Sequence, residues 1–298
     1  MRVIVTGAAG YLGGHVVDRL ANQGHTLTAL VRDATHASAW LRERARVVSC
    51  DLAVPIEAAL LEGHDACVHL AVLWPDASTQ PEIDDITASV RLFDALGRAG
   101  VGHVIYVSSA AVHRPFCAGM REDDRLVGAD AYGAAMIAGE ALLRASAATH
   151  GFRASVVRAG PCVGPSADPD RAPKTPNPIA AIHRALVEGR RARVVAHEGR
   201  QLTSCLDLSQ TIHLVLGDPN AADTLLCMAR RTTTWAEVAH ALARKLGRTE
   251  LVDVTPGERD DVSFDTTRIE GFLGRVLDAD DALDAHLDAL IATTLHGR

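Results

Sequence analysis

A short apolar strand that runs directly into a glycine-rich turn and a helix constrains the fold of this chain more than any other feature. The stretch reads "RVIVTGAAGYLGG" and places glycines at positions 7, 10 and 13. In this setting Gly7 would permit the tight turn, Gly10 a close backbone approach to a pyrophosphate, and Gly13 close packing of helix on strand. The amides of Tyr11 and Leu12 would then face the phosphates. The pattern predicts a dinucleotide-binding unit.

Short apolar runs and amphipathic stretches alternate through the first half of the chain. Strands are expected at 2–6, 26–31, 45–52, 66–72, 103–109 and 153–160, with the clearest helices at 10–24, 82–99 and 132–149. Such alternation is typical of a parallel sheet covered by helices on both faces. Right-handed crossovers then give an α/β, doubly wound parallel sheet of the Rossmann type.

The amino-acid composition changes after residue 160. The stretch "GPSADPDRAPKTPNP" (164–178) is rich in Pro, Asp and Gly and predicts a loop, a candidate lid over a substrate. We therefore expect a dinucleotide-binding Rossmann domain over 1–163, to which some later segments return. The remainder, 164–298, is expected to form a smaller α/β substrate-binding cap.

Composition excludes several classes of partner. The 298 residues carry a net charge of −7 without a long basic run, which argues against nucleic acid or an anionic membrane as partner. No apolar stretch reaches membrane-spanning length, and we see no signal peptide. The six cysteines are scattered singly, with no metal-ligand spacing, so we expect no metal and a cytoplasmic protein with reduced thiols.

The end of the second strand bears on the choice of cofactor. That strand ends at Val31, where NAD would favour a carboxylate, and Arg32 follows. A guanidinium at this position suits the 2′-phosphate of NADP, whereas Asp33 keeps NAD open as the minority option. After the third strand, Asp51 and Leu52 would flank the adenine, although Asp51 would equally serve as a helix cap.

These features together resemble the extended short-chain dehydrogenase/reductases, the epimerase/dehydratase-like group. The resemblance is carried by "TGAAGYLGG" (6–14), "DL" (51–52), "HLAV" (69–72), "YVSSAAVH" (106–113), "YGAAM" (132–136), "RAGPCVGP" (158–165) and "SCLDLSQTI" (204–212). It covers nearly the whole chain and implies a Rossmann-type domain with a small C-terminal substrate domain. It also implies that Ala71 belongs to the cofactor site, and that Ser109 and Tyr132 are the serine and tyrosine of the active site.

The chain departs from the family pattern in its catalytic half. Met136 occupies the position of the active-site lysine, four residues after Tyr132. The usual Tyr-Gly after the serine motif is replaced by His113 and Arg114. In addition, Asp85 stands at a helix asparagine position, and Ala159 replaces the proline after the strand-six arginine. The resemblance therefore implies an intact binding half and an altered catalytic half.

The loss of the lysine suggests a direction for the chemistry. Without a nearby cation the Tyr132 phenol keeps a pKa of about 10 or higher, which weakens it as the base for alcohol oxidation. A neutral phenol still donates a proton when a ketone is reduced, helped by the Ser109 hydroxyl. We therefore predict an NADPH-dependent ketoreductase. One candidate substrate is an aromatic polyketide that is modified during antibiotic biosynthesis, because its own acidic hydroxyl would supply the proton.

Two alternatives remain open from the sequence. One is a non-catalytic NADP-binding sensor or structural protein, motivated by Met136. The other is a nucleotide-sugar epimerase or dehydratase with another base, for which His113 is the obvious spare group. A nucleotide-sugar site would need arginines that converge in the cap. The candidates are Arg184, Arg190, Arg191, Arg193 and Arg200.

The sequence also suggests which segments contact the substrate and which helices could form a dimer. The expected pocket walls are 73–81, 112–120 and the 164–178 loop. The candidate substrate contacts are Trp74, His113, Phe116, Met120 and Met136. The alanine-rich helix at 132–149, with the helix at 82–99, is the candidate interface of a homodimer.

Overall fold

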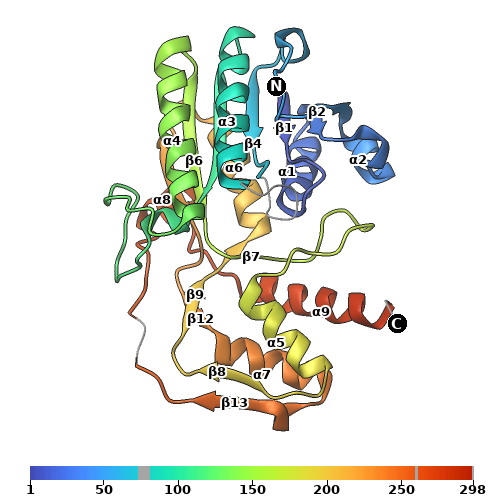
Figure 1. Ribbon diagram of the computed structural model, residues 1–298, viewed down its shortest axis with the longest axis vertical. Helices are drawn as coiled ribbons and strands as arrows, with labels where there is room; N and C mark the ends of the chain where they lie inside the picture. The colour runs from blue at the N-terminus through green and yellow to red at the C-terminus, as the bar shows by residue number, and fades with distance from the viewer. Residues whose placement is uncertain (73–80, 259–260, 297–298) are drawn as a thin grey trace.

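The centre of the computed structural model (Figure 1) is a parallel sheet of seven strands, in the order β11-β6-β5-β4-β1-β2-β3. The structure describes residues 1–72, 81–258 and 261–296. The strands of this sheet are β1 (Arg2–Thr6), β2 (Thr26–Val31), β3 (Arg46–Ser49), β4 (Ala66–His69), β5 (His103–Ser109), β6 (Arg153–Ala159) and β11 (Thr224–Cys227). The strand order reverses beside β1, so a crevice opens at the carboxyl ends of β1 and β4. The predicted doubly wound Rossmann-type fold is confirmed.

Helices cover both faces of the sheet, as the alternating side chains of its strands require. In β1, Val3 and Val5 pack into the core under one helical layer, and Ile4 packs into the core under the other. The first layer holds α1 (Tyr11–Asn22), α2 (Ala39–Arg44) and α6 (Cys205–Gly217). The second layer holds α3 (Pro81–Arg98) and α4 (Ala131–His150), which lie side by side in Figure 1. Short 3-10 turns η1 (Ala34–His36), η2 (Ala58–Leu60), η4 (Ala110–His113) and η5 (Thr249–Leu251) lie in the connections.

The second half of the chain divides between the main sheet and a cap. Strand β11 pairs with β6, and α6 packs against α1, so these later segments return to the first half. The cap, the lower body in Figure 1, has its own apolar core. Its elements are α5 (Asn177–Val187), β8 (Ala192–Val195), β9 (Gly199–Gln201), β12 (Thr232–Thr234), α7 (Trp235–Leu246), β13 (Val252–Thr255) and α9 (Asp280–His296). The pair β7 (Cys162–Val163) and β10 (Thr203–Ser204) joins the two bodies, and α8 (Thr267–Leu273) packs beside β11. That the cap binds substrate stays a prediction.

The loop expected at 164–178 has no helix or strand before α5, but it is packed against the rest of the molecule. The Tyr11 hydroxyl of α1 donates to the carbonyl of Gly164 at 2.7 Å, and His286 of α9 lies 2.8 Å from the same oxygen. Further along, Ser38 donates to the buried carboxylate of Asp168 at 2.6 Å. These bonds attach the loop to α1 and to the start of α2, beside the glycine-rich turn.

No helix in the described part of the chain combines the length and the apolar character needed to cross a membrane. The homodimer interface expected on α3 and α4 stays a prediction.

Candidate active site

The glycine-rich turn after β1 forms a closely packed cradle of backbone atoms. Gly7 has φ of +66°, and a Cβ placed on it would lie 2.8 Å from the amide nitrogen of Ala71. A Cβ on Gly13 would lie only 2.0 Å from the carbonyl oxygen of Gly7, so the first turn of α1 can pack on the strand only with glycine there. Gly10 caps α1 without a side-chain hydrogen bond. The backbone amides in the first turn of α1 are therefore available to bind an anion.

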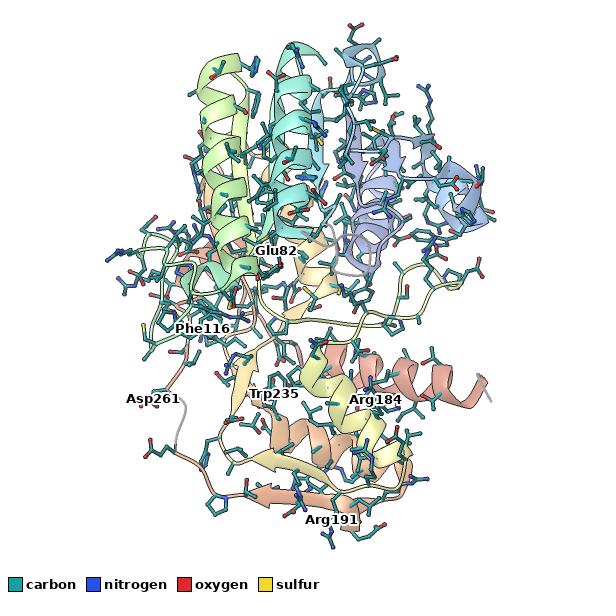
Figure 2. The ribbon with its side chains drawn as sticks, viewed as in Figure 1. Glu82, Phe116, Arg184, Arg191, Trp235 and Asp261 are labelled. Carbon is teal, nitrogen blue, oxygen red and sulfur yellow. The ribbon has the colours of Figure 1, made fainter. Side chains whose placement is uncertain are left out.

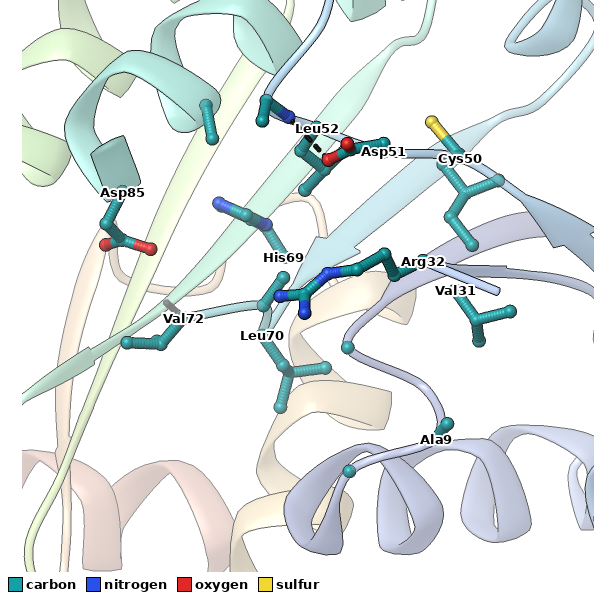
Figure 3. Close-up of a pocket in the computed structure, with 16 residues that line it drawn as sticks. Ala9, Val31, Arg32, Cys50, Asp51, Leu52, His69, Leu70, Val72 and Asp85 are labelled. Carbon is teal, nitrogen blue, oxygen red and sulfur yellow. Dashed lines mark hydrogen bonds between the residues drawn. The ribbon is translucent and has the colours of Figure 1, made fainter. Parts of the chain in front are cut away.

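A cavity of about 320 Å³ adjoins this cradle at the carboxyl ends of β1, β2 and β4 (Figure 3). The predicted cofactor residues that line it are Gly7, Gly10, Arg32, Asp51, Leu52 and Ala71. Tyr11, Leu12 and Gly13 lie in the first turn of α1 beside the cavity and do not line it. His69 at the end of β4 and Asp85 of α3 also face the cavity, and sequence reasoning did not assign either of them to the cofactor. The cradle and cavity fit a dinucleotide.

The charged groups at the adenine end of the cavity are arranged unequally. Arg32 extends into the cavity in Figure 3, and the described part of the chain offers its guanidinium no hydrogen-bonding or ionic partner. Asp33 instead turns toward its own backbone. Its carboxylate accepts bonds from the Thr35 hydroxyl and amide and contacts His36, which lowers its pKa to about 2. Asp51 accepts a bond from the amide of Ala53 at 3.0 Å, a local turn rather than a helix cap.

The fold brings the two predicted catalytic hydroxyls together. Ser109 ends β5 and accepts a bond from the Ala111 amide at 3.2 Å, where η4 begins. Tyr132 lies in the first turn of α4, which Asp130 caps by accepting from the Gly133 amide at 2.7 Å. Burial raises the pKa of the Tyr132 phenol, and a hydrogen bond with Ser109 opposes that rise. The pair therefore stands at the same edge of the sheet as the cofactor cavity.

Met136 lies on the helix one turn beyond Tyr132, and its side chain is in the core. It is 1% exposed, and the Tyr106 hydroxyl donates to its sulfur at 3.4 Å. Tyr106 stacks in turn on His69, with ring centroids 5.5 Å apart. Met136 is thus a buried, uncharged residue packed against Tyr106, and its contact with substrate stays a prediction.

A buried ion pair, which the sequence analysis missed, lies one further turn along α4. The fully buried carboxylate of Glu140 accepts two bonds of 2.8 Å from the guanidinium of Arg158 in β6 and a third from Ser108. Burial acts to raise the pKa of Glu140, but the Arg158 bonds and charge, with Ser108 and Arg144, outweigh it and lower the pKa. Two signals pointed to it: a charged residue in an apolar strand, and a glutamate in register with Tyr132 and Met136.

His113 belongs to this buried network. Arg158 donates to its Nε2 at 3.0 Å, so the proton of the neutral ring is on Nδ1, which is buried without a partner among the described residues. Burial, and then the charge of Arg158, lower the pKa of His113 to about 4. A ring that is neutral near pH 7 and already bonded to arginine is a weak candidate for a general base.

The remaining predicted substrate contacts gather where the cap meets the main sheet. Phe116, labelled at this junction in Figure 2, packs against Phe264 with ring centroids 5.7 Å apart. The guanidinium carbons of Arg114 and Arg200 lie 5.4 and 5.3 Å from the centre of the Phe116 ring. Met120 is buried in the same apolar cluster. Trp74 falls outside the described residues.

No metal centre emerges from this geometry. Over residues 1–72, 81–258 and 261–296, no group of three or more His, Cys, Asp and Glu side chains is arranged to hold a metal ion.

Comparison with known proteins identifies relatives of the chain. The UDP-glucose 4-epimerase of Azospirillum brasilense is 32% identical over 179 residues, which cover 53% of this chain and 48% of that protein. The UDP-glucose 4-epimerase of Corynebacterium glutamicum is 28% identical over 165 residues, which cover 53% of this chain and 50% of that protein. The matches thus span about half the length of these relatives.

Solved structures share the fold over the full chain. A UDP-glucuronic acid 4-epimerase from Bacillus cereus in complex with NAD superposes with a TM-score of 0.81 at 17% identity, covering 98% of this chain and 99% of that one. MoeE5 in complex with UDP-glucose and NAD gives a TM-score of 0.77 at 23% identity, covering 99% and 100%. At such identities the likeness shows the fold alone.

These comparisons correct the predicted function. The relatives are nucleotide-sugar 4-epimerases, so the prediction of a ketoreductase for an aromatic polyketide is wrong. A nicotinamide-dependent enzyme is supported, but the predicted preference for NADPH is not, because the description of the matching family names NAD.

The family model that matches the sequence covers residues 3–224 and is described as the NAD dependent epimerase/dehydratase family. This range holds the glycine-rich cradle, the cofactor cavity and the Ser109–Tyr132 pair. The chain therefore belongs to the NAD dependent epimerase/dehydratase family.

Proposed function

We propose that the chain is an enzyme that modifies the sugar of a nucleoside diphosphate sugar, in the epimerase or dehydratase class, with NAD held in the cavity at the sheet edge. The observation that carries the proposal is that Ser109, at the end of β5, and Tyr132, in the first turn of α4, lie at the same edge of the sheet as the dinucleotide cradle. That placement provides an acid–base group beside a hydride carrier. The epimerase relatives support the substrate class.

Cationic groups at the junction with the cap support an anionic substrate. Arg200 in β9 lies over the Phe116 ring, so a guanidinium and an aromatic side chain lie together where the cap meets the main sheet. The other cap arginines lie elsewhere: Arg184 and Arg191 are in the lower body in Figure 2, and Arg193 pairs with Asp253. A pyrophosphate would therefore be met by Arg200 rather than by the "EGRRAR" stretch.

The choice of NAD over NADP depends on Arg32. The family description and the complexes of the structural neighbours favour NAD. Arg32 alone favours the 2′-phosphate of NADP, since its guanidinium extends into the cavity without a partner in the described structure. We take NAD as the cofactor, and a comparison of the dissociation constants of NAD⁺ and NADP⁺ tests that choice.

The first chemical step needs a base. Bound NAD would supply the acceptor for a hydride from the sugar carbon. Tyr132 would remove the proton of the sugar hydroxyl and would return it when the sugar is reduced. Ser109 would form a hydrogen bond with the oxygen of that hydroxyl. Because burial raises the pKa of this phenol, activity should increase as the pH rises above neutrality.

The test is conversion of a nucleoside diphosphate sugar by the purified chain with NAD⁺. We would incubate it with UDP-glucose and with UDP-galactose, resolve the products by chromatography, and compare Tyr132→Phe. We expect conversion that falls about 10²- to 10⁴-fold in the variant. Failure of the chain to bind any nucleoside diphosphate sugar in the presence of NAD⁺ would contradict the proposal. Binding without turnover would favour the non-catalytic alternative.

A further inference from the structure

The chain contains almost no lysine, which limits how a cation can reach the Tyr132 phenol. Its two lysines are Lys174 and Lys245, and neither lies in the first 163 residues. Lys245 is held in the cap by two carboxylates, Asp284 at 2.8 Å and Asp288 at 2.7 Å. The helix position one turn after Tyr132 is filled by an uncharged, buried methionine. No lysine from the first half of the chain can therefore act on the phenol, and its arginines are the permanently charged groups that remain.

Two arginines are held at the buried carboxylate of Glu140: Arg158 from β6 and Arg144 from α4 itself. Arg158 donates two bonds to Glu140 and a third to the backbone carbonyl of Glu122 at 2.8 Å. Arg144 pairs with the same carboxylate at 3.3 Å and bonds Thr224 at 3.1 Å. Both guanidiniums are fixed to the buried glutamate, two turns along the helix from Tyr132.

Arg114 occupies a different place, on the turn that carries the catalytic pair. It directly follows η4, the turn that Ser109 caps. Its guanidinium pairs with Asp130, and Asp130 caps the helix on which Tyr132 lies. A Cβ on Gly133 would lie 2.8 Å from the carbonyl of Ala111, which shows how closely the start of α4 packs on η4. Arg114 is thus anchored between the two elements that bring Ser109 and Tyr132 together.

The charged and titratable groups around the phenol come from four elements. Burial raises the pKa of Tyr132 most, and the hydrogen bond with Ser109 of β5 lowers it. Cys162 of β7 and Asp85 of α3 raise it, while Arg114 lowers it. Of these groups Arg114 carries the positive charge, and its effect on the pKa is the smallest of the five.

We infer that Arg114 replaces the helix lysine as the cation that favours ionisation of Tyr132, and that Asp130 sets its position and moderates its effect. The kinetic consequence rests on the proposed function, but the electrostatic effect on the phenol does not. Arg114 is a positioning residue, since it acts through Tyr132.

The direct test is an NMR titration of tyrosine. The chain has three tyrosines, Tyr11, Tyr106 and Tyr132, so labelling the phenolic carbon gives three resonances, and Tyr132→Phe identifies the third. Burial raises the pKa values of Tyr11 and Tyr106, so neither should obscure Tyr132. The ionised fraction of Tyr132 would be compared among variants at one alkaline pH at which the circular dichroism of all of them is unchanged.

Arg114→Gln should lower the ionised fraction of Tyr132 about threefold, because it removes a positive charge that favours the ionised phenol. Arg114→Lys should retain most of the effect. The control is Arg98→Gln, which removes a paired, exposed guanidinium at the far end of α3. Equal ionised fractions in Arg114→Gln and Arg98→Gln would overturn the inference.

A substitution that should raise the ionised fraction of Tyr132 provides a second test. Asp130→Asn keeps a capping oxygen for α4 but removes the negative charge beside Arg114, so it should raise the ionised fraction of Tyr132. Adding Arg114→Gln to that variant should abolish the rise. If the double variant matched Asp130→Asn, Arg114 would have no effect on the phenol and the inference would fail.

Kinetics then separate this inference from the proposed function. If the chain converts nucleoside diphosphate sugars, Arg114→Gln should shift the alkaline rise of kcat to higher pH and leave KM nearly unchanged. If the chain converts none but the titration shows the expected shifts, the proposed function fails and the role of Arg114 stands. If the chain converts nucleoside diphosphate sugars but the titration of Tyr132 is the same in all variants, the proposed function stands and the inference about Arg114 fails.

Discussion

Replacing Glu140 by glutamine should destabilise the protein far more than an ordinary loss of one charge. The carboxylate is fully buried, and Arg158, whose side chain is 3% exposed, donates two of its bonds to it. Removing the negative charge leaves that guanidinium buried and uncompensated. Breaking a buried pair in this way costs about 3–5 kcal/mol.

The size of the effect can be stated as a melting temperature. At about 2.1 cal/mol/K per residue, the unfolding entropy of 298 residues is about 0.6 kcal/mol/K. A loss of about 4 kcal/mol then lowers Tm by about 6 °C. The assay is thermal unfolding followed by circular dichroism, with Glu140→Gln beside Glu43→Gln. Glu43 is 73% exposed and lies 3.7 Å from Arg44, so its replacement should cost no more than about 0.5 kcal/mol.

A double variant isolates the uncompensated charge. Changing Arg158 to methionine in the Glu140→Gln background removes that charge, so the double variant should be more stable than the single one. The gain will be partial, because the carbonyl of Glu122 and the Nε2 of His113 lose their donor. Equal costs for Glu140→Gln and Glu43→Gln would refute the argument that the buried pair stabilises this edge of the sheet.

Three shorter predictions concern the cofactor cavity and its surroundings. Gly13→Ala should reduce cofactor affinity at least tenfold in a binding titration, because its Cβ would meet the Gly7 carbonyl at 2.0 Å, whereas Gly217→Ala, with open space at its Cβ, should not. Arg32→Ala should weaken NADP⁺ about 10- to 100-fold and NAD⁺ less than about threefold; equal losses would show that the guanidinium does not meet a 2′-phosphate. His69 is fully buried, which lowers its pKa from 6.5 to about 4, so the unfolded chain binds the proton more readily than the folded one. The contribution of the neutral ring to the free energy of unfolding is therefore complete above pH 6.5 and is lost as the pH falls toward 4. Denaturant unfolding at a series of pH values measures this loss.

Local patterns in the sequence were sufficient for most of the fold. The strand at 103–109 was predicted with the bounds that β5 has, and the helix at 132–149 differs from α4 by one residue at each end. Both elements are set by neighbours in sequence: apolar runs, an Asp130 cap and a Gly151 with φ of +80°. The pairing of β11 with β6 is a different matter, because four residues of "TLLC" find a partner strand more than sixty residues earlier. No local rule specifies such a pairing.

The site divides in the same way. Gly7, Ser109 and Tyr132 belong to short motifs, so their roles could be proposed from spacing. The contact of Phe116 with Arg200 depends on how the cap docks on the sheet, and the two residues are distant in sequence. The incorrect ketoreductase prediction came from Met136 considered alone. It assumed that a charge missing at one position is missing from the site, whereas charge can be supplied by any element that the fold brings near.

Restoring the helix lysine by Met136→Lys tests that assumption from the other side. The position is 1% exposed and lies against the Tyr106 hydroxyl, and the carboxylate one turn further along α4 is already matched by two arginines. An ammonium there would be desolvated without a counter-charge, unless its stem carries it toward the cofactor cavity. We therefore expect Met136→Lys to lower the Tm of the free protein.

The same reasoning predicts how cofactor changes the result. A lysine drawn toward bound NAD would be stabilised only in the complex, so NAD⁺ should raise the Tm of Met136→Lys more than that of the natural chain. Met136→Leu keeps the volume and the neutrality of the position, so its response to NAD⁺ should match that of the natural chain. If NAD⁺ raised the Tm of all three proteins equally, the lysine would not reach the cofactor. The packing of Tyr106 against position 136 would then by itself prevent a lysine there from reaching the cofactor.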